Sequence, residues 1–573
     1  MKKVCLLILC AATVATGCSK EDIWSQINTP TTNTDESSSA TYTSDEEDNI
    51  SETEFERTIK IIFSTSGAAE KEGDDKGIVT IDGNYVTANN TSTTEKVTYE
   101  LSGTTTNGCF KVYSNNKQSI VLNGVSITNP NGAAINNQGK KRCFIVVNGT
   151  NSLADGTTYN TPEGEDEKAA FFSEGQLIFS GEGTLTVTAN GKSGIISDDY
   201  VHFMDSPVID VTSSAGHGIR GKDAVMVDGG TISAKVSAHM KKGVASDSLV
   251  VFNGGITTIS VTGGTAYDDD DQEYKASAGV KADQIFIMND GTLTITNSGQ
   301  GGKGISGDGP AYFNGGTVNV QVSGTNYGSS SGGNNPGGGG GWRPHATTTD
   351  NSKSAKAIKF DGGIYISGGD ISAIAANHEA IESKGQIQIS GGTVYAQSKD
   401  DAINSAGNMT ITGGRVCAYS TGNDGLDANG NMYIKGGVVY AIASGDPEVA
   451  LDANTEGGYK LYLTGGTVFA IGGLERGSSL SQSCYQSSSW SKNTWYSLTV
   501  GDDTVCFKTP SSGGSSLVVS GASKPTVKSG ITADGGTAAF NGMAVFDGSA
   551  SGGTTVSLSS YSGNSGGGGG PMW

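Results

Sequence analysis

The sequence predicts an all-β fold, a right-handed parallel β-helix of about twelve coils, with an N-terminal β cap and a C-terminal antiparallel β segment. Short alternating apolar runs are separated by turns, and the 87 glycines among 573 residues follow no G-X-Y period. A strand-Gly-Gly-strand motif and a motif of a small residue followed by an aliphatic one both recur, mostly every 22 to 25 residues. Such a period is typical of solenoids, whereas propeller blades need about 40 residues. The handedness follows from the general preference of parallel crossovers.

The first 18 residues are predicted to be an export signal. Lys2 and Lys3 precede the apolar run Val4–Val14, which is too short to span a bilayer. The run ends in Ala-Thr-Gly-Cys, which resembles the lipobox of bacterial lipoproteins and implies lipid attachment at Cys18. The acidic residues that follow resemble surface-export signals. We therefore expect a protein that is lipid-anchored in the outer membrane and exposed at the cell surface.

Composition divides the rest of the chain into four segments. Residues 19–56 are rich in Ser, Thr, Asp and Glu, and they are expected to form a disordered tether. Residues 57–118 contain less regular strands and are expected to cap the solenoid, whose periodic coils occupy 119–472. Residues 473–573 are expected to form the C-terminal antiparallel segment and a Gly-rich tail. Two insertions, 267–275 and 325–351, interrupt the period.

Acidic residues recur at matched positions of the last four coils. Stacked coils place equivalent residues about 4.8 Å apart, where two carboxylates repel by roughly 3.5 kcal/mol at an effective dielectric constant of about 20. Solvation, protonation or a bridging cation relieves this repulsion, and Ca²⁺ takes about six to eight oxygen ligands, amide carbonyls included. We therefore expect calcium ions here, with a solvated acidic edge as the alternative. The candidate ligands are Glu379, Glu382, Asp401, Asn404, Asp424, Asp427 and Asp452.

The same two columns carry positive charge in the earlier coils. One column includes His217, Lys242 and Lys303, and both columns contribute the four candidate polysaccharide-binding residues Arg220, Lys281, Lys356 and Lys359. A polyuronate would meet this edge through these cations or through a Ca²⁺ bridge. The alternative is that the lysines reduce the field of an acidic protein or keep strand edges soluble.

An aromatic stripe is predicted on the last coils. The third position after the glycine pair holds Tyr395, Cys417, Tyr440 and Phe469 in four successive coils. Tyr395 and Tyr440 are candidates for stacking against sugar rings. The alternative is that the C-terminal segment covers the stripe.

Composition and missing motifs exclude several functions. The formal net charge of −21 makes nucleic acid an improbable partner. Five cysteines follow Cys18 without CxxC spacing, which argues against a zinc or redox site. The sequence contains no GxSxG, HExxH or P-loop motif, and no catalytic residue is assigned.

Several segments resemble the secreted carbohydrate-binding β-helix family, over roughly residues 57–475. They are VLNGVSITNPNGAAI, the stretch from Gly156 to Asp199, HGIRGKDAVMVDGGTISA, DDAINSAGNMTITGGRV and DGLDANGN. The resemblance implies a fold similar to pectate lyases, calcium ions on the coils and binding of an acidic polysaccharide such as polygalacturonate, without cleavage as a family property. Asp401, Asp424 and Asp427 match the family's acidic positions, but the acid before Gly218 is replaced by His217.

These observations lead to one functional expectation with two alternatives. We expect a surface-anchored protein that binds an acidic, pectin-like polysaccharide in a calcium-dependent way without cleaving it. One alternative is a polysaccharide lyase in which Lys356 or Lys359 acts as the base. The other is a structural surface protein or adhesin.

Overall fold

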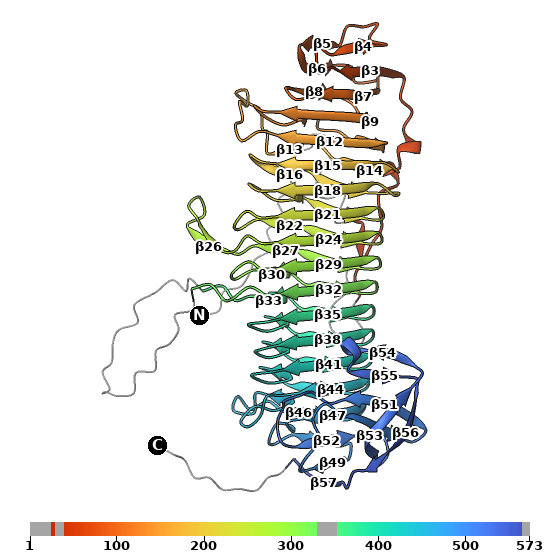
Figure 1. Cartoon of the computed structure of the whole chain (residues 1–573), viewed down its shortest axis with the longest axis vertical. Helices are drawn as coiled ribbons and strands as arrows, with labels where there is room; N and C mark the ends of the chain where they lie inside the picture. Colours follow the sequence, from red (N-terminus) through yellow and green to blue (C-terminus); the bar gives the residue numbers. More distant parts are fainter. Residues whose placement is uncertain (1–24, 29–38, 329–351, 564–573) are drawn as a thin grey trace, which may run out of the picture.

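The computed structural model of the chain describes residues 25–28, 39–328 and 352–563, and it shows a long parallel β-helix (Figure 1). Each complete coil contains three strands, one in each of three parallel ladders. The expected all-β parallel β-helix is therefore confirmed. No helix in the described part of the chain is long and apolar enough to cross a membrane. Cys18 and the export signal lie outside the described residues.

The first sheet contains fifteen strands and carries the columns discussed above. Between residues 119 and 472 it contributes twelve strands, β10 to β45, which matches the expected number of coils. The strands of the first sheet are β5 (Val79–Asp82), β6 (Asn84–Asn90), β8 (Gly108–Ser114), β10 (Ile135–Asn137), β13 (Ala169–Ser173), β16 (Ser193–Ser197), β19 (Ile219–Gly221), β22 (Lys242–Ser246), β27 (Ala278–Ala282), β30 (Lys303–Gly307), β33 (Lys356–Phe360), β36 (Ile381–Ser383), β39 (Ile403–Ser405), β42 (Leu426–Ala428) and β45 (Leu451–Ala453).

The other two ladders complete the coils. The second ladder consists of β11 (Cys143–Asn148), β14 (Leu177–Gly181), β17 (Tyr200–Phe203), β20 (Ala224–Val227), β23 (Leu249–Phe252), β28 (Ile285–Met288), β31 (Ala311–Phe313), β34 (Ile364–Ile366), β37 (Ile387–Ile389), β40 (Met409–Ile411), β43 (Met432–Ile434) and β46 (Leu461–Leu463). The third ladder consists of β12 (Thr150–Asp155), β15 (Thr184–Ala189), β18 (Val208–Ser213), β21 (Thr231–Val236), β24 (Ile256–Val261), β29 (Thr292–Asn297), β32 (Thr317–Val322), β35 (Asp370–Ala375), β38 (Thr393–Ser398), β41 (Arg415–Ser420), β44 (Val438–Ile442) and β47 (Thr467–Ile471).

Paired glycines form the turn between the second and third ladders. Gly392 has a φ of 73°, a conformation that costs glycine little because it lacks a Cβ. A Cβ at this position would lie 2.7 Å from the backbone of Gly368 in the coil above. The glycine pairs therefore allow successive turns to stack at strand spacing.

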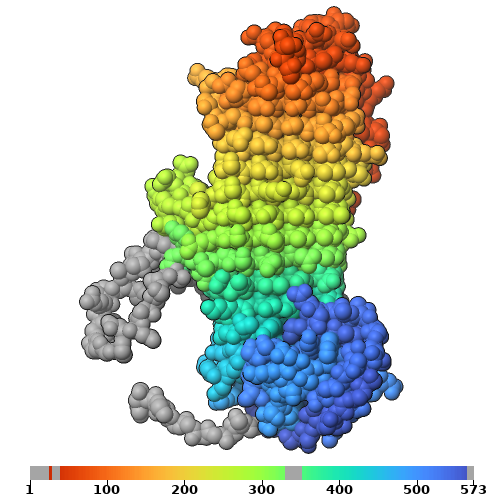
Figure 2. Space-filling view, viewed as in Figure 1, coloured from red at the N-terminus to blue at the C-terminus, as the bar shows by residue number. Residues whose placement is uncertain are grey.

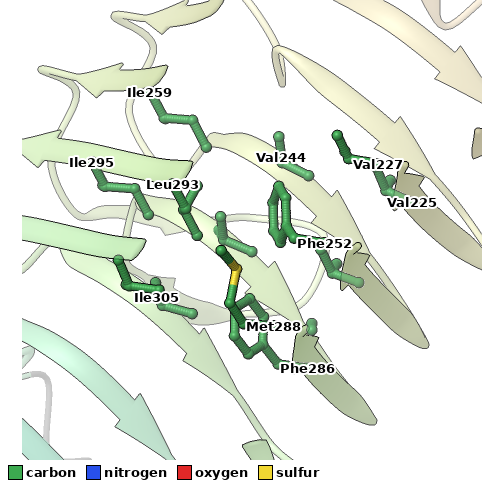
Figure 3. Packing of buried hydrophobic residues seen from close by; sticks show 14 of the residues in the cluster. Val225, Val227, Val244, Phe252, Ile259, Phe286, Met288, Leu293, Ile295 and Ile305 are labelled. Atoms are coloured by element: carbon green, nitrogen blue, oxygen red, sulfur yellow. The ribbon is translucent and has the colours of Figure 1, made fainter. Parts of the chain in front are cut away.

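Inward-pointing apolar side chains fill the β-helix in columns (Figure 3). Val227, Phe252 and Met288 occupy matched positions of three successive coils and are buried. Each coil therefore buries its apolar side chains against the next coil, which explains why the repeats need one another for stability.

The segment expected as an N-terminal cap also continues the parallel ladders. β3 (Arg57–Phe63), β7 (Val97–Thr105) and β9 (Gln118–Asn129) pair in parallel, as do β6 and β8. Two antiparallel pairs, β3 with β4 (Glu70–Glu72) and β5 with β6, lie above the first coils. The solenoid therefore begins before residue 119.

Residues 39–56 differ from the expected disordered tether. This segment, which we call the strap, contains β2 (Thr41–Tyr42) and the 3₁₀ turns η1 (Glu46–Asp48) and η2 (Ile50–Glu52), and β2 pairs with β1 (Ile27–Asn28). The strap lies along the second ladder, where Ala40 and Tyr42 are buried among apolar side chains of its strands. The amino-acid composition of the strap did not indicate that it packs on the solenoid, because the contacts join residues that are far apart in the sequence.

The C-terminal region is largely antiparallel, as expected, and lies beside the last coils (Figures 1 and 2). β52 (Leu517–Ser520) pairs in antiparallel orientation with β47, and six other strands of the region form a separate antiparallel sheet. The elements of the region are β48 (Ser479–Leu480), β49 (Cys484–Ser487), β50 (Trp495–Val500), β51 (Asp503–Lys508), β52 (Leu517–Ser520), β53 (Thr526–Asp534), β54 (Thr537–Ala539), η3 (Phe540–Gly542), β55 (Ala544–Phe546), β56 (Ser549–Thr555) and β57 (Ser559–Tyr561).

Candidate functional site: a cationic groove beside an acidic ladder

A groove of ≈ 1040 Å³ lies over the first sheet, along strands β19 to β33. One wall is the hairpin of β25 (Ala266–Asp268) and β26 (Glu273–Lys275), which projects from the body beside these strands (Figure 1). Residues 352–354 also line the groove. The first insertion and the residues that directly follow the second insertion therefore border the groove.

The stacking register is the one that the repeats predicted. Arg220 pairs with Ala245, and that column continues through Lys281, Ser306 and Lys359 to Glu382, Asn404, Asp427 and Asp452. Lys242, Ala278, Lys303 and Lys356 form the neighbouring column. One edge of the first sheet thus changes from basic to acidic along the solenoid.

The outer cations of the groove pair with acids in the turns. Arg220 contacts both carboxylate oxygens of Asp247, at 2.8 and 2.6 Å. Lys281 lies 2.8 Å from Asp283 and 2.7 Å from Asp308. Lys359 pairs with Asp361. Because most of these acids are exposed, each of these pairs is weak, and an anionic ligand can compete for the cation.

Lys242 and Lys303 differ from these cations, because neither forms an ion pair with any residue that the structure describes. The Lys242 ammonium donates a hydrogen bond to the Met240 carbonyl at 2.7 Å, and that of Lys303 donates to the Ser354 carbonyl. Burial, together with nearby lysines, lowers the pKa of Lys242 to about 8 and that of Lys303 to about 7. Both ammonium groups therefore lack the counter-charge that a bound anion would supply.

Lys356 marks the boundary between the basic and acidic coils. It is buried, lies 3.2 Å from Glu379 and also pairs with Glu382, which Lys384 contacts as well. Burial opposes ionisation of Glu382, but the Lys356 ammonium lowers its pKa. These two predicted metal ligands thus already have cationic partners, and Lys356 itself is engaged, so these three residues fit their predicted roles less well than their neighbours do.

The acidic ladder, defined as Asp401, Asn404, Asp424, Asp427 and Asp452, has no such partners, because its acids form no ion pair within the described ranges. The Asn404 amide donates to Asp401 at 3.0 Å and to Asp427 at 2.7 Å. Asp401 and Asp424 each accept a backbone N–H from the next coil, of Asp424 and Val449 respectively. The ladder therefore places carboxylate and carboxamide oxygens on three successive coils.

Burial, reinforced by neighbouring carboxylates, raises the pKa of every acid in the ladder. The pKa reaches about 6 at Asp401, about 7 at Asp427, about 8 at Asp424 and about 9 at Asp452. These shifts express first the cost of ionising carboxyl groups that are largely removed from water, and second the repulsion between neighbouring carboxylates. Carboxylate and carboxamide oxygens are the ligand types that a hard cation such as Ca²⁺ prefers.

Tighter groups of possible ligands occur elsewhere in the described residues. His378, Glu379 and Asp400, and likewise Asp166, Glu174 and Asp198, each place three ligand atoms within 4.8 Å of one another. The second group already contains a cation, since Lys168 pairs with Asp166 and Asp198. The ladder, by contrast, spreads its carboxylates at strand spacing, as its register requires.

The two tyrosines predicted to bind sugar are not available for that role. Tyr395 and Tyr440 are 4% and 0% exposed, because the C-terminal sheet covers them. The Tyr440 hydroxyl donates to the Lys508 carbonyl at 2.9 Å, and its ring lies 4.9 Å from that of Phe507. The prediction was wrong for both residues, and the alternative of a covered stripe holds. The useful signal was that the stripe occurs only in coils next to the C-terminal segment.

Sequence reasoning missed one feature of the groove, the tyrosines of its wall. Tyr274 lines the groove, and its ring contacts those of Tyr267 and Tyr327. Four aspartates dominate the composition of the insertion at 267–275, so its composition did not indicate an aromatic wall. The two tyrosines that flank those aspartates were the available signal.

Comparison with known proteins supports the resemblance to a carbohydrate-binding family. A family model described as "Carbohydrate-binding domain-containing protein" matches residues 82–240 and 301–402, which together are just under half of the chain. The expected likeness to a carbohydrate-binding β-helix family is confirmed over these residues. They include Arg220, Lys303, Lys356, Lys359 and Asp401.

The other two comparisons add less. No curated protein matches the chain. A solved structure of the polysaccharide lyase-like protein from C. thermocellum, in a gadolinium derivative, matches with 22% identity and a TM-score of 0.36. That match covers 44% of this chain and 96% of the other.

Proposed function

We propose that this protein binds an acidic, pectin-like polysaccharide along the first sheet, with calcium, and does not cleave it. The observation that carries the proposal is the groove floor, where the half-buried Lys242 and Lys303 form no ion pair with any described residue, in a chain of net charge −21. A polyanion that enters the groove would supply the missing counter-charge and compensate for its own desolvation.

The solenoid repeat suits a polymer with regularly spaced charges. Arg220 and Lys281 lie two coils apart in one column, as do Lys281 and Lys359. At strand spacing this separates neighbouring cations by roughly 10 Å. A linear chain of acidic sugars that runs along the solenoid would therefore meet a cation at regular intervals.

Calcium would occupy the acidic ladder in this proposal. Asp401, Asn404, Asp424 and Asp427 would hold the ion, which would neutralise the ladder and accept carboxylate oxygens of the same polysaccharide. The family resemblance also favours calcium on the coils. We further propose that lipid attachment at Cys18 holds the protein at the outer surface of the outer membrane.

A pull-down tests the proposal. Purified protein is incubated with insoluble polygalacturonate, with Ca²⁺ or with a chelator, and the supernatant is read for unsaturated product at about 235 nm. We expect retention with Ca²⁺, weaker retention with the chelator, and no product. Retention that is equal in both conditions would contradict the calcium dependence, and no retention would contradict binding and favour the structural alternative.

Matched variants locate the interaction. Arg220→Glu combined with Lys281→Glu should reduce retention by about 100-fold, because two attractive contacts become repulsive. Asp427→Asn should retain binding in the chelator but lose the calcium-dependent gain. Lys235→Glu changes an exposed lysine on β21, outside the groove, and should behave as the unmodified protein. Equal effects of all charge reversals would contradict a localised site.

One observation favours a polysaccharide lyase as a second candidate. The Lys303 amine lies in the groove with its pKa lowered to about 7, in the range where an amine serves as a general base. Lys356 is less suited to that role, because two glutamates hold its ammonium. Unsaturated product in the same pull-down, lost on Lys303→Met, would establish this candidate in place of the first.

A further inference from the structure

The two insertions of the solenoid meet in a cluster of three tyrosines. The Tyr274 ring lies 5.1 Å from that of Tyr267 across the β25–β26 hairpin, and 5.4 Å from that of Tyr327 at the start of the second insertion. Backbone hydrogen bonds between Tyr327 and Lys353 join the two ends of the second insertion. The cluster therefore connects two segments that are independent in sequence.

None of these tyrosines belongs to a hydrophobic core of the described chain. Tyr267 is 46% exposed, and Tyr274 and Tyr327 are half-buried. The hairpin that carries two of them is otherwise polar, and Lys275 holds it together by pairing with Asp268 at 2.9 Å and with Asp271. The three rings are therefore partly exposed, and none of the hydrophobic cores needs them for its packing.

Of the three tyrosines, Tyr274 is the one that lines the groove, together with the cations of its floor. An acidic sugar has both a carboxylate and an apolar face of C–H groups. A groove that offers ammonium groups on its floor and an aromatic ring on its wall is complementary to both features. Neutral sugars would gain only the aromatic contact, and small acidic ions only the ammonium contact.

We infer that Tyr274 is the sugar-stacking residue of the groove and that Tyr267 and Tyr327 hold its ring in place. This inference rests on the proposed function and adds a specificity-determining residue to it. The ring contacts the apolar face of the sugar, and the cations of the floor bind its carboxylate. Tyr274 thereby takes the role that Tyr395 and Tyr440 cannot have, since those rings are buried.

Binding measured at two ionic strengths tests the inference, because salt screens ion pairs and leaves stacking nearly unchanged. The ligand is an oligogalacturonate, titrated by calorimetry at about 50 mM and about 500 mM NaCl. Tyr274→Ala should weaken binding about tenfold at both concentrations. Lys281→Ala should weaken it strongly at low salt and only slightly at high salt. Tyr274→Phe keeps the ring and should bind nearly as the unmodified protein does.

Two results would overturn the inference, and a third would overturn its premise. Binding by Tyr274→Ala that equals the unmodified protein means that the ring does not contact the ligand. Binding by Tyr274→Phe that is as weak as Tyr274→Ala means that the hydroxyl, not stacking, is required. If the unmodified protein binds no oligogalacturonate at either salt concentration, the proposed function itself fails, whatever the tyrosine variants do.

Discussion

At the scale of single residues, His202 has a carboxylate partner at each of its two ring nitrogens. It is fully buried on β17, with Nδ1 2.8 Å from Asp48 of the strap and Nε2 2.9 Å from Asp228 after β20. Arg142 and the Tyr200 hydroxyl also bind Asp48. The buried carboxylate of Asp48, which several partners share, is thus one of the points that attach the strap to the solenoid.

Titration of His202 should make the attachment of the strap to the solenoid depend on pH. Burial opposes its protonation, but Asp228 and Asp48 raise its pKa to about 9. The pKa of His202 in the folded protein lies above the ordinary histidine value of 6.5. The stabilisation of the strap by protonated His202 is therefore fully present below about pH 6.5 and is lost as the pH rises through about 9. We expect chymotrypsin to cleave the strap at Tyr42 or Phe55 at least tenfold faster at about pH 10 than at about pH 6, relative to a free peptide of the same sequence.

Two histidine variants complete this experiment. His202→Gln should allow fast cleavage at all pH values in the range, because it removes the titrating charge. His239→Gln changes an exposed histidine outside the network and should keep the pH dependence of the unmodified protein. A pH dependence that persists in His202→Gln would assign the effect to another group.

At the scale of elements, the C-terminal sheet acts as a cover for the last coils. Phe507 on β51 packs on Tyr440 and on Phe469, with ring centroids 4.9 and 5.0 Å apart. Cys417 is fully buried in the same cluster. The cover protects an aromatic stripe that would otherwise be a large exposed apolar patch.

Loosening the cover should expose Cys417. Phe507→Ala removes a buried ring, at a cost of about 3–5 kcal/mol, from the contact between the two elements. We expect the Cys417 thiol to react with a maleimide at least tenfold faster, as measured by mass spectrometry of its peptide. Cys143, which is buried at the other end of the solenoid, is the internal control and should remain protected. Equal protection of Cys417 in both proteins would mean that Phe507 does not hold the cover.

At the scale of the whole molecule, the repeat explains what could be predicted from the sequence. Because each coil contacts only its neighbours, a period of 22 to 25 residues was sufficient to predict the fold and to place Asn404 beside Asp427. Features that depend on distant contacts could not be predicted in this way. Asp48 of the strap binds Arg142 and His202, 94 and 154 residues away, and no local pattern indicates such pairs.

The same distinction between repeat-determined features and other contacts applies to the candidate site. The cationic and acidic columns were predicted because they follow the register. The pairing of Lys356 with Glu379 and Glu382 was not, since it depends on how side chains from successive coils reach one another. The Tyr274–Tyr327 contact was also missed, because it joins two insertions outside the repeat.

The central claim is that an acidic polysaccharide lies along the cationic groove of the first sheet. Hydrogen–deuterium exchange with and without a calcium-loaded oligogalacturonate tests it most directly, because the exchange reports where the ligand lies. We predict slower exchange in β19 to β33 and in the hairpin at residues 266–275, with the strap and the C-terminal sheet unchanged. Protection that appears only outside these strands, while the ligand is bound, would contradict the claim.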